Sequence, residues 1–189
     1  STEDKYAETF VKNSNLLEYE VHDYTEWDDA ILGCDYDDSH LPSVVEAKPL
    51  ETEYYFSDCP RDGVVQTYIP KVISQVGDTT VYDVGVNMSG IPVLRSKGEK
   101  CKIKVSFSEE IDENGNPEEE HSMWQWFEAT VGEKPVEIKN VFSWYAFRYL
   151  KVEGKADLVS VLRTHTDVEI TSSFDSSDPT LNWIYNAYL

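Results

Sequence analysis

Residues 101–107 read Cys-Lys-Ile-Lys-Val-Ser-Phe, so apolar and polar side chains alternate along the whole stretch. Successive side chains of a β-strand point to opposite faces of its sheet. One face of this stretch would carry Cys101, Ile103, Val105 and Phe107. The alternation therefore predicts a strand with one buried and one exposed face.

Similar stretches lie on both sides of this segment at short spacing. They are VVQTYI from Val64, TTVYDVGV from Thr79, IPVLRS from Ile91, MWQWFEATV from Met123, FSWYAFRYLKVEG from Phe142 and DLVSVLRTH from Asp157. Turn-forming pairs separate them, among them Gly77-Asp78, Ser89-Gly90, Lys97-Gly98, Asn114-Gly115 and Gly154-Lys155. Many short strands with no helix between them predict an all-β fold, an antiparallel β-sandwich over residues 63–170.

The residues before the sandwich are more polar and hold only short strand candidates. These candidates are LLEYEV, PSVVEA and TEYYFS, and acidic loops such as Asp35–Asp38 lie between them. We interpret residues 1–62 as an extended β flank. It either packs on the sandwich or is the end of an upstream β domain.

Residues 171–189 carry the signals of a helix start. Ser177-Asp178-Pro179 combines a capping side chain with a proline near the first helical position. One apolar stripe follows at helical spacing, formed by Leu181, Ile184, Tyr185 and Tyr188. Because this stripe needs a partner, we interpret residues 171–189 as a linker and the first helix of a further, truncated domain.

The charge balance narrows the classes of partner. The chain has 16 Lys and Arg against 36 Asp and Glu, a formal net charge of −20. Such a chain repels phosphate backbones and anionic lipids, so nucleic acid and membrane surfaces are poor partners. Apolar runs long enough for a membrane helix are also missing from the sequence.

The cysteines and the first residues bear on the compartment. Cys34, Cys59 and Cys101 are odd in number and lack the spacing of a metal site. Cys34 and Cys59 could pair in an oxidising compartment, but reduced thiols are the simpler interpretation. Ser-Thr-Glu-Asp-Lys at the start is no signal peptide. These features favour the cytoplasm, although an excised segment would have lost a signal.

Four short motifs follow one another along the chain. They are Asp23–Ala30 with its Trp27, Tyr82–Gly90 followed by Val105–Glu109 and Asp112–Gly115, Phe142 with Phe147-Arg148-Tyr149 and Val152–Gly154, and Phe174–Pro179 with Asn182. In this order and spacing, over residues 23–186, they resemble the bacterial α-L-rhamnosidase family of glycoside hydrolases.

The resemblance implies a concanavalin-like jelly roll that precedes a catalytic α/α barrel. It implies a parent enzyme that hydrolyses terminal α-L-rhamnose with inversion, by carboxylates in a barrel that would follow Leu189. No catalytic position of the family maps onto this chain, so the chain alone is expected to be inactive, with no cofactor and no metal. Its expected partners are the catalytic domain and, through the parent, rhamnosylated carbohydrate. The alternatives are a carbohydrate-binding module and a protein-interaction sandwich.

Aromatic residues supply the candidate binding site. Trp124 and Trp126 are two residues apart, so on a strand they share a face and could form a platform for a sugar ring. Trp144 and Tyr149 offer a similar surface. Burial in the core is the simpler interpretation of all four, because large aromatic side chains usually serve packing.

Polar clusters in the strand region have structural interpretations. Asp83, Gly85, Asn87 and Gly90 could hold a sugar or cation, but the same residue types favour a strand that enters a tight turn. The acidic run 108–121 fails the EF-hand pattern and is expected to be a solvated loop. Arg148 lies in an apolar strand and needs a carboxylate partner, for which Asp83 and Glu109 are candidates.

Overall fold

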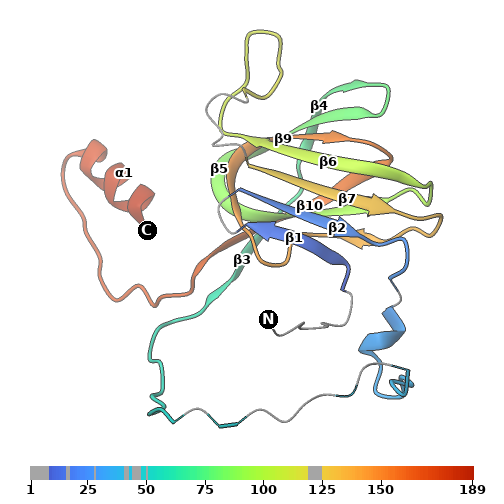
Figure 1. The fold of residues 1–189 in the computed structure, drawn as a ribbon. Coiled ribbons are helices and arrows are strands. Elements are labelled where there is room, and N and C mark those ends of the chain that lie inside the picture. The colour runs from blue at the N-terminus through green and yellow to red at the C-terminus, as the bar shows by residue number, and fades with distance from the viewer. Residues whose placement is uncertain are drawn as a thin grey trace.

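The computed structural model describes residues 9–15, 18–27, 29–40, 43, 48–49, 51–118 and 125–189. Its elements are β1 (Val11–Asn15), β2 (Tyr19–Asp23), a 3-10 turn (Asp29–Leu32), β3 (Asp62–Tyr68), β4 (Lys71–Val76), β5 (Thr79–Ser96), β6 (Cys101–Ser108), β7 (Trp126–Val131), β8 (Glu137–Ile138), β9 (Tyr145–Glu153), β10 (Ala156–Thr166) and α1 (Pro179–Tyr188). The predicted fold class is confirmed: the described chain is built from strands, with one short helix near its C-terminus (Figure 1).

The long strand β5 belongs to two layers. Its first half pairs with β4 and β9, and its second half pairs with β8 and β10. One layer therefore runs β4-β5-β9-β6-β7-β2-β1, and the other runs β8-β5-β10-β3. The pairing with β9 is interrupted between Asp83 and Met88, where Gly85 takes a φ of +91° that favours glycine. The irregularity lets one strand bend from the first layer into the second (Figure 1).

The apolar faces of the two layers share one core. Ile103, Val105 and Phe107 of β6 point into it, which confirms the face predicted from residues 101–107. Other core residues come from all the central strands: Tyr82, Leu94, Phe127, Ala129, Val131, Ile138, Tyr145, Phe147, Leu150, Val152, Leu158 and Val161. Phe107 stacks on Tyr145 with ring centroids 4.1 Å apart.

The N-terminal flank joins the first layer. β1 and β2 form an antiparallel pair, and β2 then lies beside β7 in parallel, with Tyr19 opposite Trp126 and Asp23 opposite Thr130. The parallel pair attaches the flank to the sandwich, whereas the described strand pairs within the predicted sandwich of residues 63–170 are antiparallel, as expected. Two strands with a long intervening chain can meet in either direction, and only a hairpin requires the antiparallel one. The domain boundary at residue 62 stays a prediction, although β2 itself pairs with the sandwich.

Two details of the strand prediction are wrong. Ser89-Gly90 is not a turn, because β5 runs through it and Gly90 pairs with both Tyr145 and Arg163. A Cβ at Gly90 would lie 2.7 Å from the carbonyl oxygen of Leu162, so this glycine permits a close approach of β10 rather than a turn. The stretch TEYYFS at residues 52–57 forms no strand, and most of PSVVEA lies outside the described residues.

The C-terminal helix begins as predicted. The carboxylate of Asp178 accepts a hydrogen bond from the backbone N–H of Thr180 at 2.8 Å, and Pro179 is the first helical residue. The helix lies apart from both layers (Figure 1). Its side chains meet the preceding segment, as in the Ser172 Oγ–Tyr185 Oη distance of 3.0 Å. The stripe residues Leu181, Ile184 and Tyr188 stay exposed.

A hollow walled by residues 141–144

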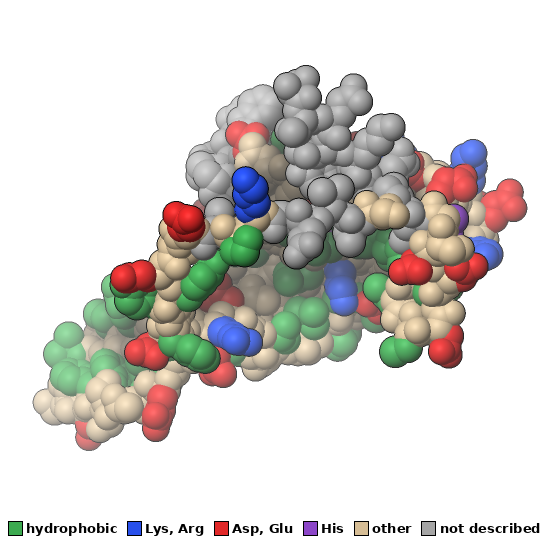
Figure 2. Space-filling view, turned by 60° about the horizontal axis from the view of Figure 1, so that its bottom comes forward, with side chains coloured by type: hydrophobic (Ala, Val, Ile, Leu, Met, Phe, Trp, Pro, Cys, Tyr) green, Lys and Arg blue, Asp and Glu red, His purple; other side chains and the backbone are tan. Residues whose placement is uncertain are grey.

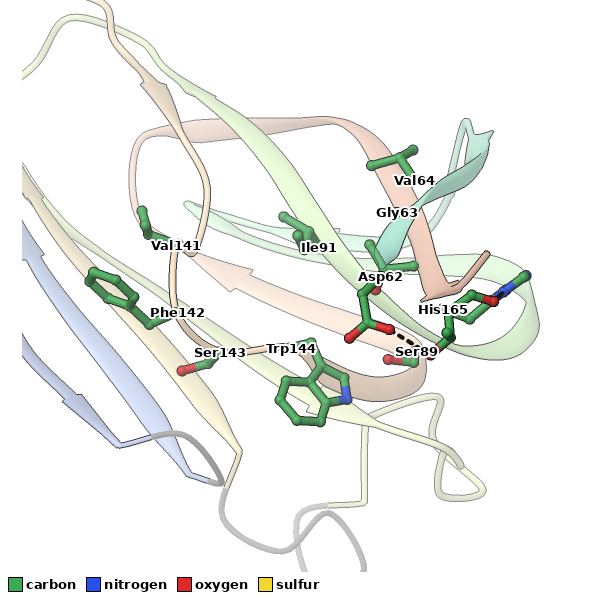
Figure 3. Close-up of a pocket in the computed structure, with 12 residues that line it drawn as sticks. Asp62, Gly63, Val64, Ser89, Ile91, Val141, Phe142, Ser143, Trp144 and His165 are labelled. Atoms are coloured by element: carbon green, nitrogen blue, oxygen red, sulfur yellow. Dashed lines mark hydrogen bonds between the residues drawn. The ribbon is translucent and has the colours of Figure 1, made fainter. Parts of the chain in front are cut away.

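A hollow of about 560 Å³ opens between the end of the second layer and the segment that connects β8 to β9. Val141, Phe142, Ser143 and Trp144 of that segment lie along one side, as Figure 3 shows. The opposite side is formed by the start of β3, the end of β10 and the middle of β5: Asp62, Gly63, Val64, Ser89, Ile91, Thr164, His165 and Thr166. Three strands distant in sequence therefore meet one connecting segment here.

The hollow combines exposed rings with short polar side chains. Trp144 is 50% exposed and Phe142 is 60% exposed, so both leave ring surface in contact with solvent. The carboxylate of Asp62 accepts a hydrogen bond from Thr166 Oγ1 at 2.6 Å across the β3–β10 pair. Ser89 and Thr164 add hydroxyl groups. Rings beside hydroxyls and one carboxylate suit a polyhydroxylated ligand better than a purely apolar one.

A fully buried carboxylate lies behind the aromatic wall. Glu20 of β2 is 0% exposed. Its side chain accepts hydrogen bonds from three consecutive backbone N–H groups, those of Val141 at 2.9 Å, Phe142 at 2.7 Å and Ser143. Three backbone amides that converge on one anion form an anion-binding concavity. The segment 141–143 thus wraps around a charge that the N-terminal flank supplies.

His22 and Tyr24 extend this network along the same face of β2. His22 is also 0% exposed, with Nε2 2.7 Å from Glu20 Oε2 and Nδ1 3.0 Å from the Tyr24 hydroxyl. A neutral His22 that carries its proton on Nε2 satisfies both contacts, since it donates to Glu20 and accepts from Tyr24. Each polar atom of this row then has a partner.

The environment of the row shifts two pKa values in opposite directions. Burial alone raises the pKa of Glu20, but the hydrogen bonds from His22 and the three amides outweigh it and hold the pKa below its usual value. Burial, with the nearby charge of Glu20, raises the pKa of Tyr24 well above its usual value. Glu20 is therefore a carboxylate and Tyr24 a phenol at neutral pH.

The hydrophobic pattern could not reveal this row. In Tyr19–Tyr24 the buried positions are Glu20, His22 and Tyr24, whereas Val21 is only half-buried. An alternation search places Val21 inside and the charged residues outside, which is the reverse of what is found. The usable signal is the spacing itself, because Glu-x-His-x-Tyr puts three hydrogen-bonding side chains on one face of a strand.

The predicted tryptophan platform lies only partly within the described residues. Trp126 stacks on Tyr19 with ring centroids 4.7 Å apart and planes 5° apart, so one face of its indole is already covered. Trp124 lies outside the described residues, and the platform therefore stays a prediction. Trp144, the second aromatic surface that the sequence suggests, is the tryptophan that lines the hollow.

The Asp83 cluster makes structural contacts, but at an irregularity inside β5 rather than at the tight turn that the sequence predicted. Asp83 accepts two hydrogen bonds from Arg148, from Nε at 2.9 Å and Nη2 at 3.0 Å, and a third from the backbone N–H of Gly85 at 2.6 Å. The guanidinium of Arg148 holds the pKa of Asp83 below its usual value. Asn87 donates instead to Glu109, at 3.1 Å. Of the two partners proposed for Arg148, Asp83 is the right one.

Other classes of site find little support in the part of the chain that the structure describes. It contains no cluster of three or more His, Cys, Asp or Glu residues arranged to hold a metal ion. None of its helices is long and apolar enough to cross a membrane. Acidic side chains are scattered over the face in Figure 2 rather than gathered in one patch. The three cysteines are unpaired.

Comparison with protein families decides the assignment of the fold. Residues 74–173, more than half of the chain, match the model of the bacterial alpha-L-rhamnosidase concanavalin-like domain. The chain belongs to this family. The match covers β5 to β10, which include strands of both layers and the β5, β8–β9 and β10 parts of the hollow.

Individual rhamnosidases agree with the family match. An alpha-L-rhamnosidase of Formosa agariphila is 27% identical over 168 residues, which cover 80% of this chain and 17% of that protein. The L-rhamnose complex of the Streptomyces avermitilis enzyme superposes with a TM-score of 0.78 at 18% identity, and covers 95% of this chain and 18% of that one. The alpha-L-rhamnosidase of Dictyoglumus thermophilum superposes with a TM-score of 0.72 at 24% identity, and the superposition covers 90% of this chain and 20% of that one. This chain thus spans about a fifth of the length of these relatives.

Proposed function

We propose that this chain is a non-catalytic, architectural β-sandwich of an α-L-rhamnosidase whose complete form hydrolyses terminal α-L-rhamnose from glycosides with inversion. The membership of the rhamnosidase concanavalin-like family supports this proposal. So does the length of the match, because about four-fifths of each related enzyme lies outside the region that this chain covers. The chemistry then resides in another domain, which the sandwich supports.

The carboxylates in and behind the described part of the hollow also support this proposal. Inverting glycoside hydrolysis needs a general acid and a general base on opposite faces of the sugar, with carboxyl groups about 6.5–9.5 Å apart. Asp62 is the one carboxylic acid among the described residues that line the hollow, and it already accepts a hydrogen bond from Thr166. Glu20 lies behind the wall and its oxygens are occupied by four donors. The described lining of the hollow thus lacks the second carboxylate that the reaction requires.

Hydrolysis of an aryl α-L-rhamnoside tests the proposal directly. The purified 189-residue chain should release no aryl alcohol above the rate of a mock purification from the same host. The same chain, extended through the remainder of its reading frame, should be active. Turnover by the short chain that survives the mock control and disappears in Asp62→Asn would overturn the proposal.

A second candidate function is carbohydrate binding in the hollow. The observation that favours it is the exposed Trp144 ring beside the polar groups of Asp62 and Ser89 (Figure 3). Stacking of a sugar on one exposed ring supports only weak binding, with a dissociation constant in the millimolar range and a binding free energy of about −4 kcal/mol.

A rhamnose titration monitored by tryptophan fluorescence separates the two candidates. Trp144→Ala removes the ring in the hollow, and Trp183→Ala is the matched control because Trp183 is exposed on α1, away from the hollow. A saturable response that Trp144→Ala abolishes and Trp183→Ala retains favours binding. If the fluorescence of the unsubstituted chain does not change on addition of rhamnose, the binding candidate is excluded and the architectural role is favoured.

A further inference from the structure

We infer that Glu20 is a positioning residue: from the N-terminal flank it sets the conformation of residues 139–144 and so the shape of the aromatic wall of the hollow. This role depends neither on sugar binding nor on the activity of the parent enzyme. Glu20 joins two parts of the chain whose hydrogen-bonded residues are more than 120 positions apart in sequence.

The hydrogen bonding of Glu20 is directed at one connecting segment. One carboxylate oxygen accepts from the amides of Phe142 and Ser143, and the other accepts from Val141 and His22. A carboxylate offers about four acceptor sites. Three of the four are filled by the segment between β8 and β9, so this buried charge serves mainly to hold that segment.

The segment has little apolar burial of its own to hold it. Val141, Phe142 and Trp144 all point outward and stay about half exposed or more. Its inward side chains are polar: Asn140 and Ser143 are buried, and Asn140 Nδ2 donates to the Ser143 carbonyl oxygen. A loop that packs few apolar groups depends on its hydrogen bonds for a fixed shape.

The N-terminal flank meets the segment at more than one point. Ser143 Oγ lies 3.4 Å from the carbonyl oxygen of Asn15, and the Tyr145 hydroxyl donates to the Trp126 carbonyl oxygen at 3.1 Å. Trp126 in turn donates its backbone N–H to the carbonyl oxygen of Glu18. Asn15 therefore contacts the segment directly, whereas Glu18 reaches it only through Trp126 and Tyr145, the residue that follows the segment.

The consequence for the hollow is geometric. Phe142 and Trp144 are the ring-bearing residues of the wall, and the amides of Phe142 and its neighbours are fixed to Glu20. Replacement of Glu20 by Gln keeps the length but turns one acceptor into an NH2 group that faces backbone N–H donors. At least one amide of residues 141–143 then loses its partner, and the segment is free to move.

Hydrogen–deuterium exchange of the native chain tests this directly. In Glu20→Gln, the amides of residues 141–143 should exchange about ten-fold faster or more than in the unsubstituted chain, because a charge-assisted bond has been lost. Over a labelling time in which β6 and β10 of the unsubstituted chain do not exchange, their amides should also stay protected in Glu20→Gln, because these strands open only on global unfolding and the substituted chain remains folded. Glu18→Gln is the matched control: Glu18 is exposed two residues away, bonds Asn15 and should leave all exchange rates unchanged.

A second measurement reports the wall itself. With fluorinated tryptophan, the 19F signal of Trp144, assigned through Trp144→Phe, should shift or broaden in Glu20→Gln while the signal of Trp183 stays in place.

Amide exchange that accelerates evenly over β6, β10 and residues 141–143 would reduce Glu20 to a general stabiliser and overturn the inference. So would unchanged exchange at residues 141–143. If Glu20→Gln does not fold, Glu20→Asp replaces it, since one lost methylene withdraws the carboxylate from the same amides and is judged by the same two outcomes.

Discussion

Strands β6 and β7 bury apolar side chains and expose charged ones, whereas the segment 139–144 buries polar side chains and exposes apolar ones. In β6 and β7, the apolar side chains point inward and lysines and glutamates point outward, as with Ile103 and Lys104. In 139–144, polar Asn140 and Ser143 are buried and Phe142 is exposed. Apolar packing fixes the first region through many weak contacts, whereas hydrogen bonds to one charge fix the second. The two regions should therefore respond differently to substitution, pH and salt.

The largest effect is expected where the apolar region is broken. Phe107 is 1% exposed and lies against Tyr145 and Phe147, with ring centroids 4.1 and 5.0 Å away. Phe107→Ala should lower the free energy of unfolding by about 3–5 kcal/mol, through lost burial and the cavity that remains. Urea unfolding followed by circular dichroism measures it.

The matched control for this cavity is Val64→Ala, since Val64 is 55% exposed. It should change the free energy of unfolding by less than about 0.5 kcal/mol. Equal losses for Phe107→Ala and Val64→Ala would mean that the core does not lie where β6 places it.

The segment 139–144, which is held by hydrogen bonds to Glu20, should instead lose its stabilisation at low pH. The pKa of Glu20 in the folded chain lies below its ordinary value of 4.5. Its stabilising contribution is thus fully present above pH 4.5 and is lost as the pH falls through the folded pKa. Glu20→Gln removes this titration and should lower the free energy of unfolding by about 2–3 kcal/mol at pH 7.

Urea unfolding at about pH 7 and about pH 3 measures the effect as a difference between the two chains. The gap between the unsubstituted chain and Glu20→Gln should shrink on acidification, although both chains lose stability because many other carboxylates titrate. Phe107→Ala provides the contrast, with a gap that stays nearly constant over the same range. A Glu20 gap that widens in acid would mean that the folded pKa of Glu20 is raised rather than lowered.

These two regions also explain how far the sequence could predict the structure. Residues 101–107 predicted their own strand and its buried face, because burial of alternate apolar side chains is a local property. Glu20 could not be placed in this way, since its partners are the backbone amides of Val141, Phe142 and Ser143, which any residue but proline provides. The turn predicted at Gly90 was wrong for a related reason, because a glycine is equally compatible with a turn and with the close approach of another strand, here at Leu162. Local patterns predict elements, and they do not predict which distant backbone a polar side chain meets.

A third substitution asks whether charge pairing alone is enough to fix a region. Asp83 and Arg148 form a bidentate pair, but their side chains are 22% and 40% exposed. Solvent and salt screen such a pair, so Asp83→Asn should lower the free energy of unfolding by no more than about 1 kcal/mol, less than Glu20→Gln does. Added salt should reduce the loss further. A loss as large as that of Glu20→Gln would show that burial does not separate the two carboxylates.

The smallest effect is expected outside both regions. Deletion of residues 178–189 removes α1, whose side chains contact its own preceding segment. The sandwich should keep its free energy of unfolding within about 0.5 kcal/mol, and any self-association should weaken because exposed Leu181 and Ile184 are lost. Thermal unfolding and sedimentation measure the two results. If the chain unfolds on this deletion, the helix belongs to the core, and the predicted boundary between the sandwich and residues 171–189 is wrong.

The parallel partnership of β2 and β7 has a consequence for the order of events during synthesis. Within this domain β1 and β2 leave the ribosome before the other strands, yet the strand beside β2 and the amides around Glu20 emerge more than a hundred residues later. Contacts this distant along the chain close slowly. We therefore expect a late docking phase, in which the sandwich is already collapsed while its β7 edge is still bare and open to pairing with other chains. Of the strands of this domain, β1 and β2 would be made before the others and incorporated last.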